Sequence, residues 1–142
     1  MAPSEEINIP QKPPMVMVDR VVEQFDKTTI TAFLIREDNI FVENGEFREA
    51  GLMENMAQSA AASVGMKPGI QPGAAPIGFI GAVKNLKINR LPVTGEEIVT
   101  SVTVLFEVFQ ATIVQARITV NQQEIASCEL KIFLLQTGST NE

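Results

Sequence analysis

Glu54 and Gln58 are the residues whose types and spacing best suit chemistry in this chain. They lie in GLMENMAQSAAASVGM, residues 51–66, where Glu54 is the only charged side chain. Residues four apart on a helix are neighbours on one face, so a helix here places the carboxylate beside the amide. A carboxylate can take or give a proton, and a lone acid on such a helix is a candidate site.

The segment around Glu54 predicts a helix, because Ala, Met and other residues with good helix propensity dominate it. At 100° per residue, one side carries Met53, Met56, Ala57, Ala60 and Val64, and another carries Glu54, Asn55, Gln58 and Ser59. The polar side has two interpretations. It faces water, as in an ordinary amphipathic helix, or other parts of the backbone approach it closely, which the many Ala and Ser residues favour.

The residue types that are missing narrow the chemistry further. The chain has no His, Trp or Tyr and a single cysteine, Cys128. Without His, a Ser-His-Asp or Cys-His arrangement is excluded, and a zinc site has no support. Since no glycine-rich phosphate loop is present either, we expect no metal and no cofactor. Proton transfer must use carboxylates, Lys or the cysteine.

Length and charge favour one acidic globular domain. The 142 residues suit a single domain spanning 1–142, with flexible tails expected at 1–8 and 136–142. A net charge of −6 and a pI near 4.7 argue against nucleic acid, since no basic stripe is present. We find no membrane span or signal peptide pattern and expect a cytoplasmic protein, which the single cysteine suits.

Six segments have the β-branched, alternating pattern of strands, and they flank the predicted helix as two before and four after. They are residues 15–25, 28–36, 77–91, 98–108, 110–120 and 125–135. Residues 37–47 and 67–76 are expected to be loops, and Asn121-Gln122 closes the last hairpin. This order predicts an α+β fold in which an antiparallel sheet curls around one long helix. The phase of the last strand turns Cys128 toward the core, where a reactive role is not expected.

The chain resembles hotdog-fold β-hydroxyacyl-acyl-carrier-protein dehydratases over residues 9–135. The resemblance lies in IPQKPPMVMVDRVVE (9–23), NGEF (44–47), ENMAQ (54–58), FIGAVKNLKINRLPVTGEEI (79–98) and ASCELKIF (126–133). Together these motifs are fairly specific, although no single one is. The resemblance implies a dimer or a higher even-numbered oligomer with a continuous sheet. It also implies an acyl chain in a tunnel at the subunit interface, delivered on acyl carrier protein or coenzyme A.

The same resemblance implies dehydration of a 3-hydroxyacyl thioester by a His of one subunit and a Glu of the other. Glu54 matches the helix carboxylate of the family, and Gln58 matches its helix glutamine near the thioester. At the expected His position this chain has Glu46. Our hypothesis is therefore a carboxylate pair that shares one proton, with Glu46 as base and Glu54 as acid. The alternative is that Glu46 is a solvated loop residue and the reaction is lost.

Two further functions stay open at this point. Hotdog thioesterases also place an acid and a Gln near this helix. A non-catalytic subunit that binds an acylated carrier and partners an active homologue is the other alternative.

Substrate and carrier contacts are also predicted from the motifs. The residues expected to bind substrate are Phe47, Met53, Gly78, Phe79 and Ile80. Acidic carrier proteins are normally met by basic side chains, for which Lys84, Lys87 and Arg90 are the candidates. Scattered solvated charges on one strand are the alternative interpretation of these three residues.

Overall fold

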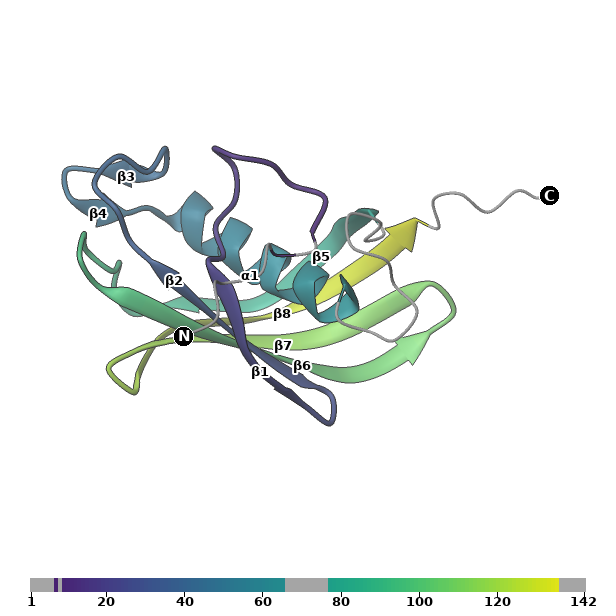
Figure 1. Cartoon of the computed structure of the whole chain (residues 1–142). Helices are drawn as coiled ribbons and strands as arrows, with labels where there is room; N and C mark the ends of the chain where they lie inside the picture. Colours follow the sequence, from purple (N-terminus) through teal and green to yellow (C-terminus); the bar gives the residue numbers. More distant parts are fainter. Residues whose placement is uncertain (1–6, 8, 66–76, 136–142) are drawn as a thin grey trace.

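A six-stranded antiparallel sheet curls around one helix (Figure 1). The computed structural model describes residues 7, 9–65 and 77–135. Along the chain the elements are β1 (Arg20–Phe25), β2 (Thr28–Leu34), β3 (Val42–Glu43), β4 (Glu46–Phe47), α1 (Glu49–Gly65), β5 (Ile77–Ile88), β6 (Glu97–Val108), β7 (Ala111–Val120) and β8 (Gln123–Leu135). The predicted α+β hotdog architecture is confirmed. The predicted loop 67–76 and the expected flexible tails, except residue 7, lie outside the described residues.

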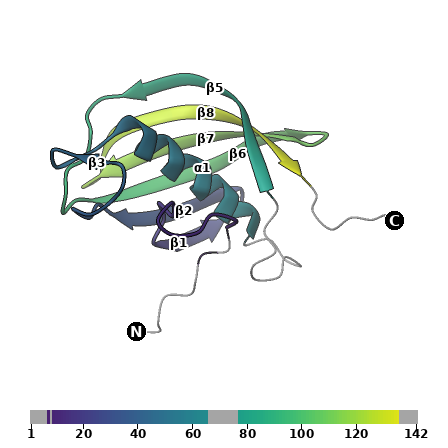
Figure 2. The ribbon, with the colours of Figure 1, turned by 90° about the horizontal axis from the view of Figure 1, so that it is seen from above.

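The sheet has the strand order β1-β2-β6-β7-β8-β5, as Figure 2 shows from above the helix. Every neighbouring pair is antiparallel. The β7–β8 turn is the predicted one, with Asn121 and Gln122 at φ 50° and 70°. Such positive φ values belong to two-residue hairpin turns whose twist matches the strands. Strands β1 and β5 form the two edges of the described sheet.

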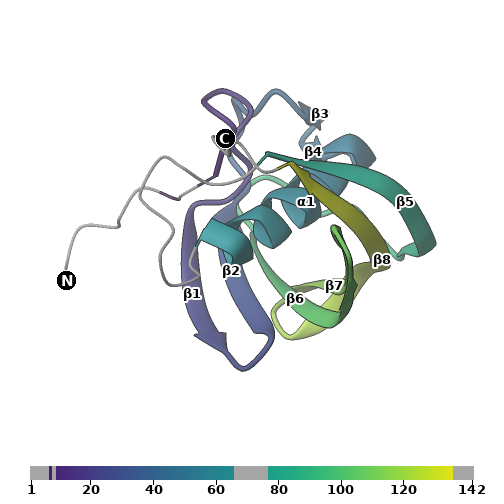
Figure 3. The ribbon, with the colours of Figure 1, turned by 90° about the vertical axis from the view of Figure 1, so that its right-hand side faces the viewer.

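Helix α1 lies in the concavity of the sheet (Figure 3). Leu52 and Met56 have no exposed surface and pack among core residues such as Ile98, Ile118 and Leu130. Burying a large aliphatic side chain contributes about 1.5–3 kcal/mol, so this layer between helix and sheet stabilises the fold. The helix that carries Glu54 is therefore held firmly against the sheet.

The predicted first strand, residues 15–25, is wrong in its first half, because β1 begins at Arg20. The backbone of Met15 and Met17 bonds to side chains of α1 instead of to a neighbouring strand. The predicted loop 37–47 also differs, since β3 and β4 form a small hairpin within it. Asn44 and Gly45 at its turn have φ 54° and 78°, which a two-residue hairpin requires.

Cys128 is 1% exposed on β8, which confirms the prediction that it faces the core. Its Sγ lies 3.7 Å from Sδ of Met56 on the helix. Burial, with a smaller effect from Glu129, raises the pKa of the thiol to about 11. The thiolate is the reactive form, so a buried thiol of this kind is inert.

We expect thiol reagents to modify Cys128 readily only after unfolding. At pH 8.5 the pKa shift alone makes labelling of the folded chain about 100-fold slower than labelling in urea. As pH rises from the ordinary thiol pKa toward 11, the unfolded chain loses this proton first, so stability falls. Comparing the free energy of unfolding with that of Cys128→Ala over this range isolates the effect. Equal labelling rates for the folded and unfolded chain would contradict it.

Candidate functional site

The polar side of α1 is buried rather than solvated. Asn55, Gln58 and Ser59 have no exposed surface. Of the two interpretations that the sequence leaves open, the close approach of other backbone is therefore confirmed. Buried polar side chains are stable only when they are hydrogen-bonded, and each of these three has a partner.

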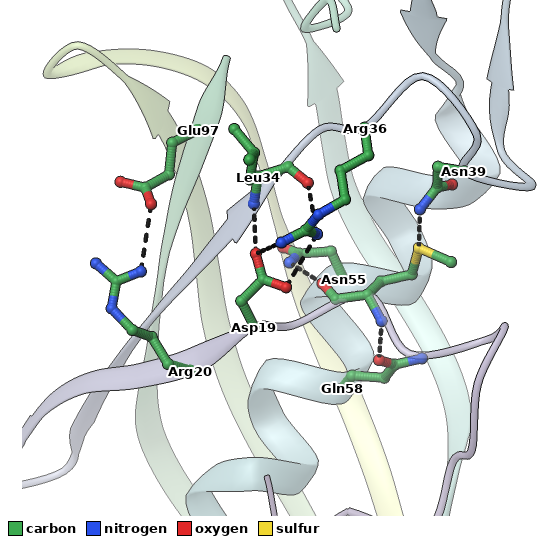
Figure 4. A network of polar contacts seen from close by, with 9 residues as sticks. Asp19, Arg20, Leu34, Arg36, Asn39, Asn55, Gln58 and Glu97 are labelled. Carbon is green, nitrogen blue, oxygen red and sulfur yellow. Dashed lines mark hydrogen bonds and ion pairs between the residues drawn. The ribbon is translucent and has the colours of Figure 1, made fainter. Parts of the chain in front are cut away.

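Gln58 holds the segment that precedes β1 and also holds Glu54. Its Oε1 accepts a 2.6 Å hydrogen bond from the Met17 backbone N–H, and its Nε2 donates to the Met15 carbonyl at 2.7 Å. The same Nε2 donates to Oε2 of Glu54 at 2.8 Å. Figure 4 shows the amide of Gln58 turned toward this segment. Both ends of the amide are thus engaged within the chain.

Asn55 and Ser59 extend this bonding to the sheet. The Nδ2 of Asn55 donates to the Met17 carbonyl at 2.7 Å, and its Oδ1 accepts from Thr100 of β6 at 2.6 Å. The hydroxyl of Ser59 lies 2.8 Å from that of Thr31 on β2. The polar side of α1 thereby joins the helix to two strands and to the segment before β1.

The Asp19 carboxylate fixes the end of that segment that lies next to β1 (Figure 4). Asp19 accepts hydrogen bonds from Nη1 and Nη2 of Arg36, at 3.1 and 3.2 Å, and from the Leu34 backbone N–H at 2.7 Å. Bidentate pairing of this kind fixes orientation as well as distance. The chain therefore enters β1 along one defined path.

Glu54 is partly buried and lies one helical turn before Ala57. Ala57 lines a cavity of about 60 Å³, together with Ala60 and Ala61 of the helix. Residues three or four apart share one helix face, so Glu54, Ala57 and Ala61 form a single row. Glu49, the other carboxylate of the helix, is exposed, so Glu54 is its one partly buried carboxylate. Glu54 thus stands at one end of a row of small side chains that leads to a cavity.

The remaining walls of this cavity, which we call the α1 cavity, are mostly apolar. Phe79 and Ile80 of β5 contribute to them, as predicted for substrate-binding residues, although their role in binding stays a prediction. The other lining residues are Pro10, Gln11, Ser63, Val104, Glu107, Thr112, Val114 and Ile132. Apolar walls with a few polar groups are typical of sites for small molecules.

The other predicted substrate-binding residues lie outside the α1 cavity lining. Phe47 has no exposed surface, and its ring centroid is 5.8 Å from that of Phe33. A Cβ on Gly51 would lie 2.5 Å from the Phe47 ring, so the start of the helix packs directly on this side chain. Met53 is a partly buried neighbour of the core, and Gly78 lies in β5 opposite Leu134.

Glu46 lies on β4 with its side chain 45% exposed. Its Oε1 forms a 3.1 Å ion pair with Arg48, whereas Glu54 bonds to Gln58. The contacts described within one chain therefore do not join the two carboxylates of the hypothesis.

The three predicted carrier contacts differ in their surroundings. Arg90 forms two hydrogen bonds with Glu96, at 2.9 and 3.1 Å. This pairing raises the pKa of Arg90 and lowers that of Glu96. Lys84 and Lys87 are exposed on the edge strand β5. Lys84 borders a surface hollow of about 810 Å³ on the β6–β7 hairpin side, together with Lys131 and exposed aromatic rings such as Phe109.

The sequence model of the ApeP-like family, described as ApeP dehydratase, matches residues 3–140. The chain belongs to this family. No curated protein sequence matches the chain significantly. The family match agrees with the resemblance drawn from the NGEF and ENMAQ motifs, and it identifies this ApeP-like chain as dehydratase-related.

Solved structures show the same fold at low sequence identity. The dehydratase heterocomplex ApeI:P from Xenorhabdus doucetiae matches with a TM-score of 0.83 and 14% identity, over 92% of this chain and 90% of that one. The PaaI protein from the phenylacetic acid degradation operon of E. coli matches with a TM-score of 0.64 and 11% identity, over 80% of each chain. A hypothetical thioesterase from Streptococcus pneumoniae, solved with coenzyme A, matches with a TM-score of 0.64 and 8% identity, over 82% of this chain and 84% of that one. These likenesses establish the hotdog fold of the ApeP-like chain.

None of the described helices combines the length and hydropathy needed to cross a bilayer. Within the described ranges, no three His, Cys, Asp or Glu side chains gather as metal ligands would.

Two residues at the site escaped the sequence analysis. The sequence places Asn55 on the polar side of the helix, but it does not predict the hydrogen bonds of its side chain to the Met17 carbonyl and to Thr100. Gln11 lies in the proline-rich segment IPQKPP, and nothing in that pattern indicates a place beside the helix. Both depend on contacts between segments far apart in the chain.

We expect Gln58→Leu to destabilise the ApeP-like chain by about 1–3 kcal/mol, because it leaves the buried Met17 N–H without a partner and removes the bond to the Met15 carbonyl. Urea unfolding measures the loss, and hydrogen exchange of the Met17 amide locates it. Gln123→Leu, at an exposed position of β8, is the matched control. An unchanged midpoint together with unchanged Met17 exchange would show that the amide does not hold this segment.

Proposed function

We propose that this chain is a dehydratase subunit that acts on a 3-hydroxyacyl thioester, with Glu54 as its proton-transfer residue. The observation that carries the proposal is the position of Glu54. It is the one partly buried carboxylate of the central helix, whose other carboxylate, Glu49, is exposed. It is oriented by Gln58, and its row of small side chains leads to the α1 cavity. The ApeP-like family membership supports the same reaction class.

Dehydration requires two proton transfers. A base removes a proton from C2, the electron pair of that bond forms the C2=C3 double bond, and the C3–O bond breaks. An acid gives the departing hydroxyl its proton, so that water leaves. Glu54 supplies one of these groups. Gln58 acts as a positioning residue, because its amide is already bonded to the carboxylate and to the backbone.

The second group is best supplied by a partner subunit. The chain has no His, and Glu46 is half exposed and bonded to Arg48 rather than to Glu54. The similar Xenorhabdus doucetiae structure is a dehydratase heterocomplex, which supports assembly with a second hotdog subunit. A homodimer that uses Glu46 with Glu54 is the second candidate, since Glu46 precedes the helix by only a few residues and is accessible to another chain.

The edge strand β5 supports assembly. Four of its large apolar side chains are 40–53% exposed, namely Phe79, Ile80, Val83 and Leu86. Monomeric proteins protect sheet edges, and an edge this apolar suits pairing with another strand. We propose that β5 joins the partner in a continuous sheet, and that Lys84 and Lys87 on it contact an acidic acyl carrier protein. Coenzyme A thioesters are the alternative carrier.

We expect Glu54→Gln to lower kcat for dehydration by about 100-fold or more, because an amide cannot transfer the proton. The assay follows conversion of 3-hydroxyacyl carrier-protein thioesters, with the chain alone and co-expressed with a His-containing hotdog dehydratase subunit of the same organism. Glu46→Gln should retain activity within about twofold, since an exposed ion pair contributes little. Glu43→Gln, exposed on β3, is the matched control.

The same assay separates the alternatives. Activity of the chain alone that both Glu46→Gln and Glu54→Gln abolish would instead support the homodimeric carboxylate pair. Release of free thiol from saturated acyl thioesters would support a thioesterase. Full activity of the complex with Glu54→Gln would refute the role of Glu54 and leave this chain a binding subunit.

A further inference from the structure

The α1 cavity contains a buried hydrogen-bond acceptor that the described residues do not pair. The Oε1 atom of Gln11 is shielded from solvent and accepts no hydrogen bond from any described residue. Gln11 is one of the residues that line the cavity. Nearly all buried polar atoms in native proteins are paired, so an unpaired amide oxygen beside a cavity favours a ligand that brings a donor.

The surroundings of Gln11 limit what that ligand is. The cavity is also lined by Val104, Val114 and Ile132 of the sheet and by the alanines of the helix. An apolar acyl group suits these walls, whereas the one unpaired oxygen selects an O–H or N–H group at one point. A wholly aliphatic ligand would fill the space but leave Oε1 without a donor, at a cost in affinity.

The cavity also has a defined position relative to the reacting carbons. Ala61 follows Glu54 by seven residues, which is about 10 Å along a helix. A thioester whose C2 and C3 lie at Glu54 would therefore reach Gln11 with the far part of its acyl group.

We propose that Gln11 determines specificity by accepting a hydrogen bond from a hydroxyl or amide N–H group on the distal part of the acyl chain. This inference rests on the proposed function for the direction in which the substrate lies. The substrate class is accordingly a 3-hydroxyacyl thioester whose far end carries a second polar group that donates a hydrogen bond. Gln11 is a binding residue in this account and takes no part in the proton transfers.

The test measures binding without turnover. Saturated acyl-coenzyme A thioesters from hexanoyl to dodecanoyl, each with and without a terminal hydroxyl, cannot be dehydrated because they lack the 3-hydroxyl. Calorimetry on the wild-type assembly should show about tenfold tighter binding of one or two hydroxylated chain lengths over their plain counterparts. Gln11→Leu should abolish this preference, and Gln11→Met, a second apolar variant, should do the same. Gln123→Leu, exposed on β8, should leave it intact.

Other results would overturn the inference. A preference that persists in Gln11→Leu, or no preference at any length in the wild type, rejects Gln11 as the acceptor for the acyl group. If both Gln11 variants weaken all coenzyme A thioesters equally, but not the same acyl groups as S-ethyl thioesters, which carry no amide, the donor is a pantetheine amide and the acyl assignment is wrong. Because binding is read separately, inactivity of the assembly toward 3-hydroxyacyl thioesters would reject the proposed function without changing these readings.

Discussion

The buried amides of Asn55 and Gln58 are the contacts on which the arrangement of this site depends. They bond to the backbone of Met15 and Met17 at 2.6–2.7 Å, where a strand would normally bond to its neighbour. Met17, Asn55 and Gln58 are fully buried, so breaking a bond between them leaves two polar groups without water or another partner. The segment before β1 is therefore fixed against the helix with a stringency that apolar packing alone would not give.

Three parts of the site share this one arrangement. The Nε2 atom of Gln58 donates both to the backbone segment and to the Glu54 carboxylate. The same segment leads back to Pro10 and Gln11, which close one side of the α1 cavity. A single turn of the helix thus positions the Glu54 carboxylate, the cavity wall and the start of β1. A change at Gln58 alters all three.

The sequence predicts what depends on local pattern and misses what depends on distant partners. Alternation in β6, β7 and β8 and the Asn121-Gln122 turn were sufficient for the sheet, and a carboxylate on an alanine-rich helix was sufficient to single out Glu54. The run from Met15 to Val18 has the composition of a strand, yet its partners are side chains about forty residues later. The burial of Gln11 depends likewise on the sheet and the helix together, which no local pattern records.

One chain contains only part of a catalytic site, which supports a function shared between subunits. One chain holds an oriented acid and a lined cavity, but no His and no second free carboxylate at contact distance among the described contacts. Phe79 and Ile80 belong both to the cavity lining and to the exposed apolar edge of β5. A partner that pairs with β5 would therefore cover part of the cavity wall while it brings its own side chains toward the site. Assembly and enclosure of the substrate would then be one event, which explains why the edge strand stays apolar in a chain with a net charge of −6.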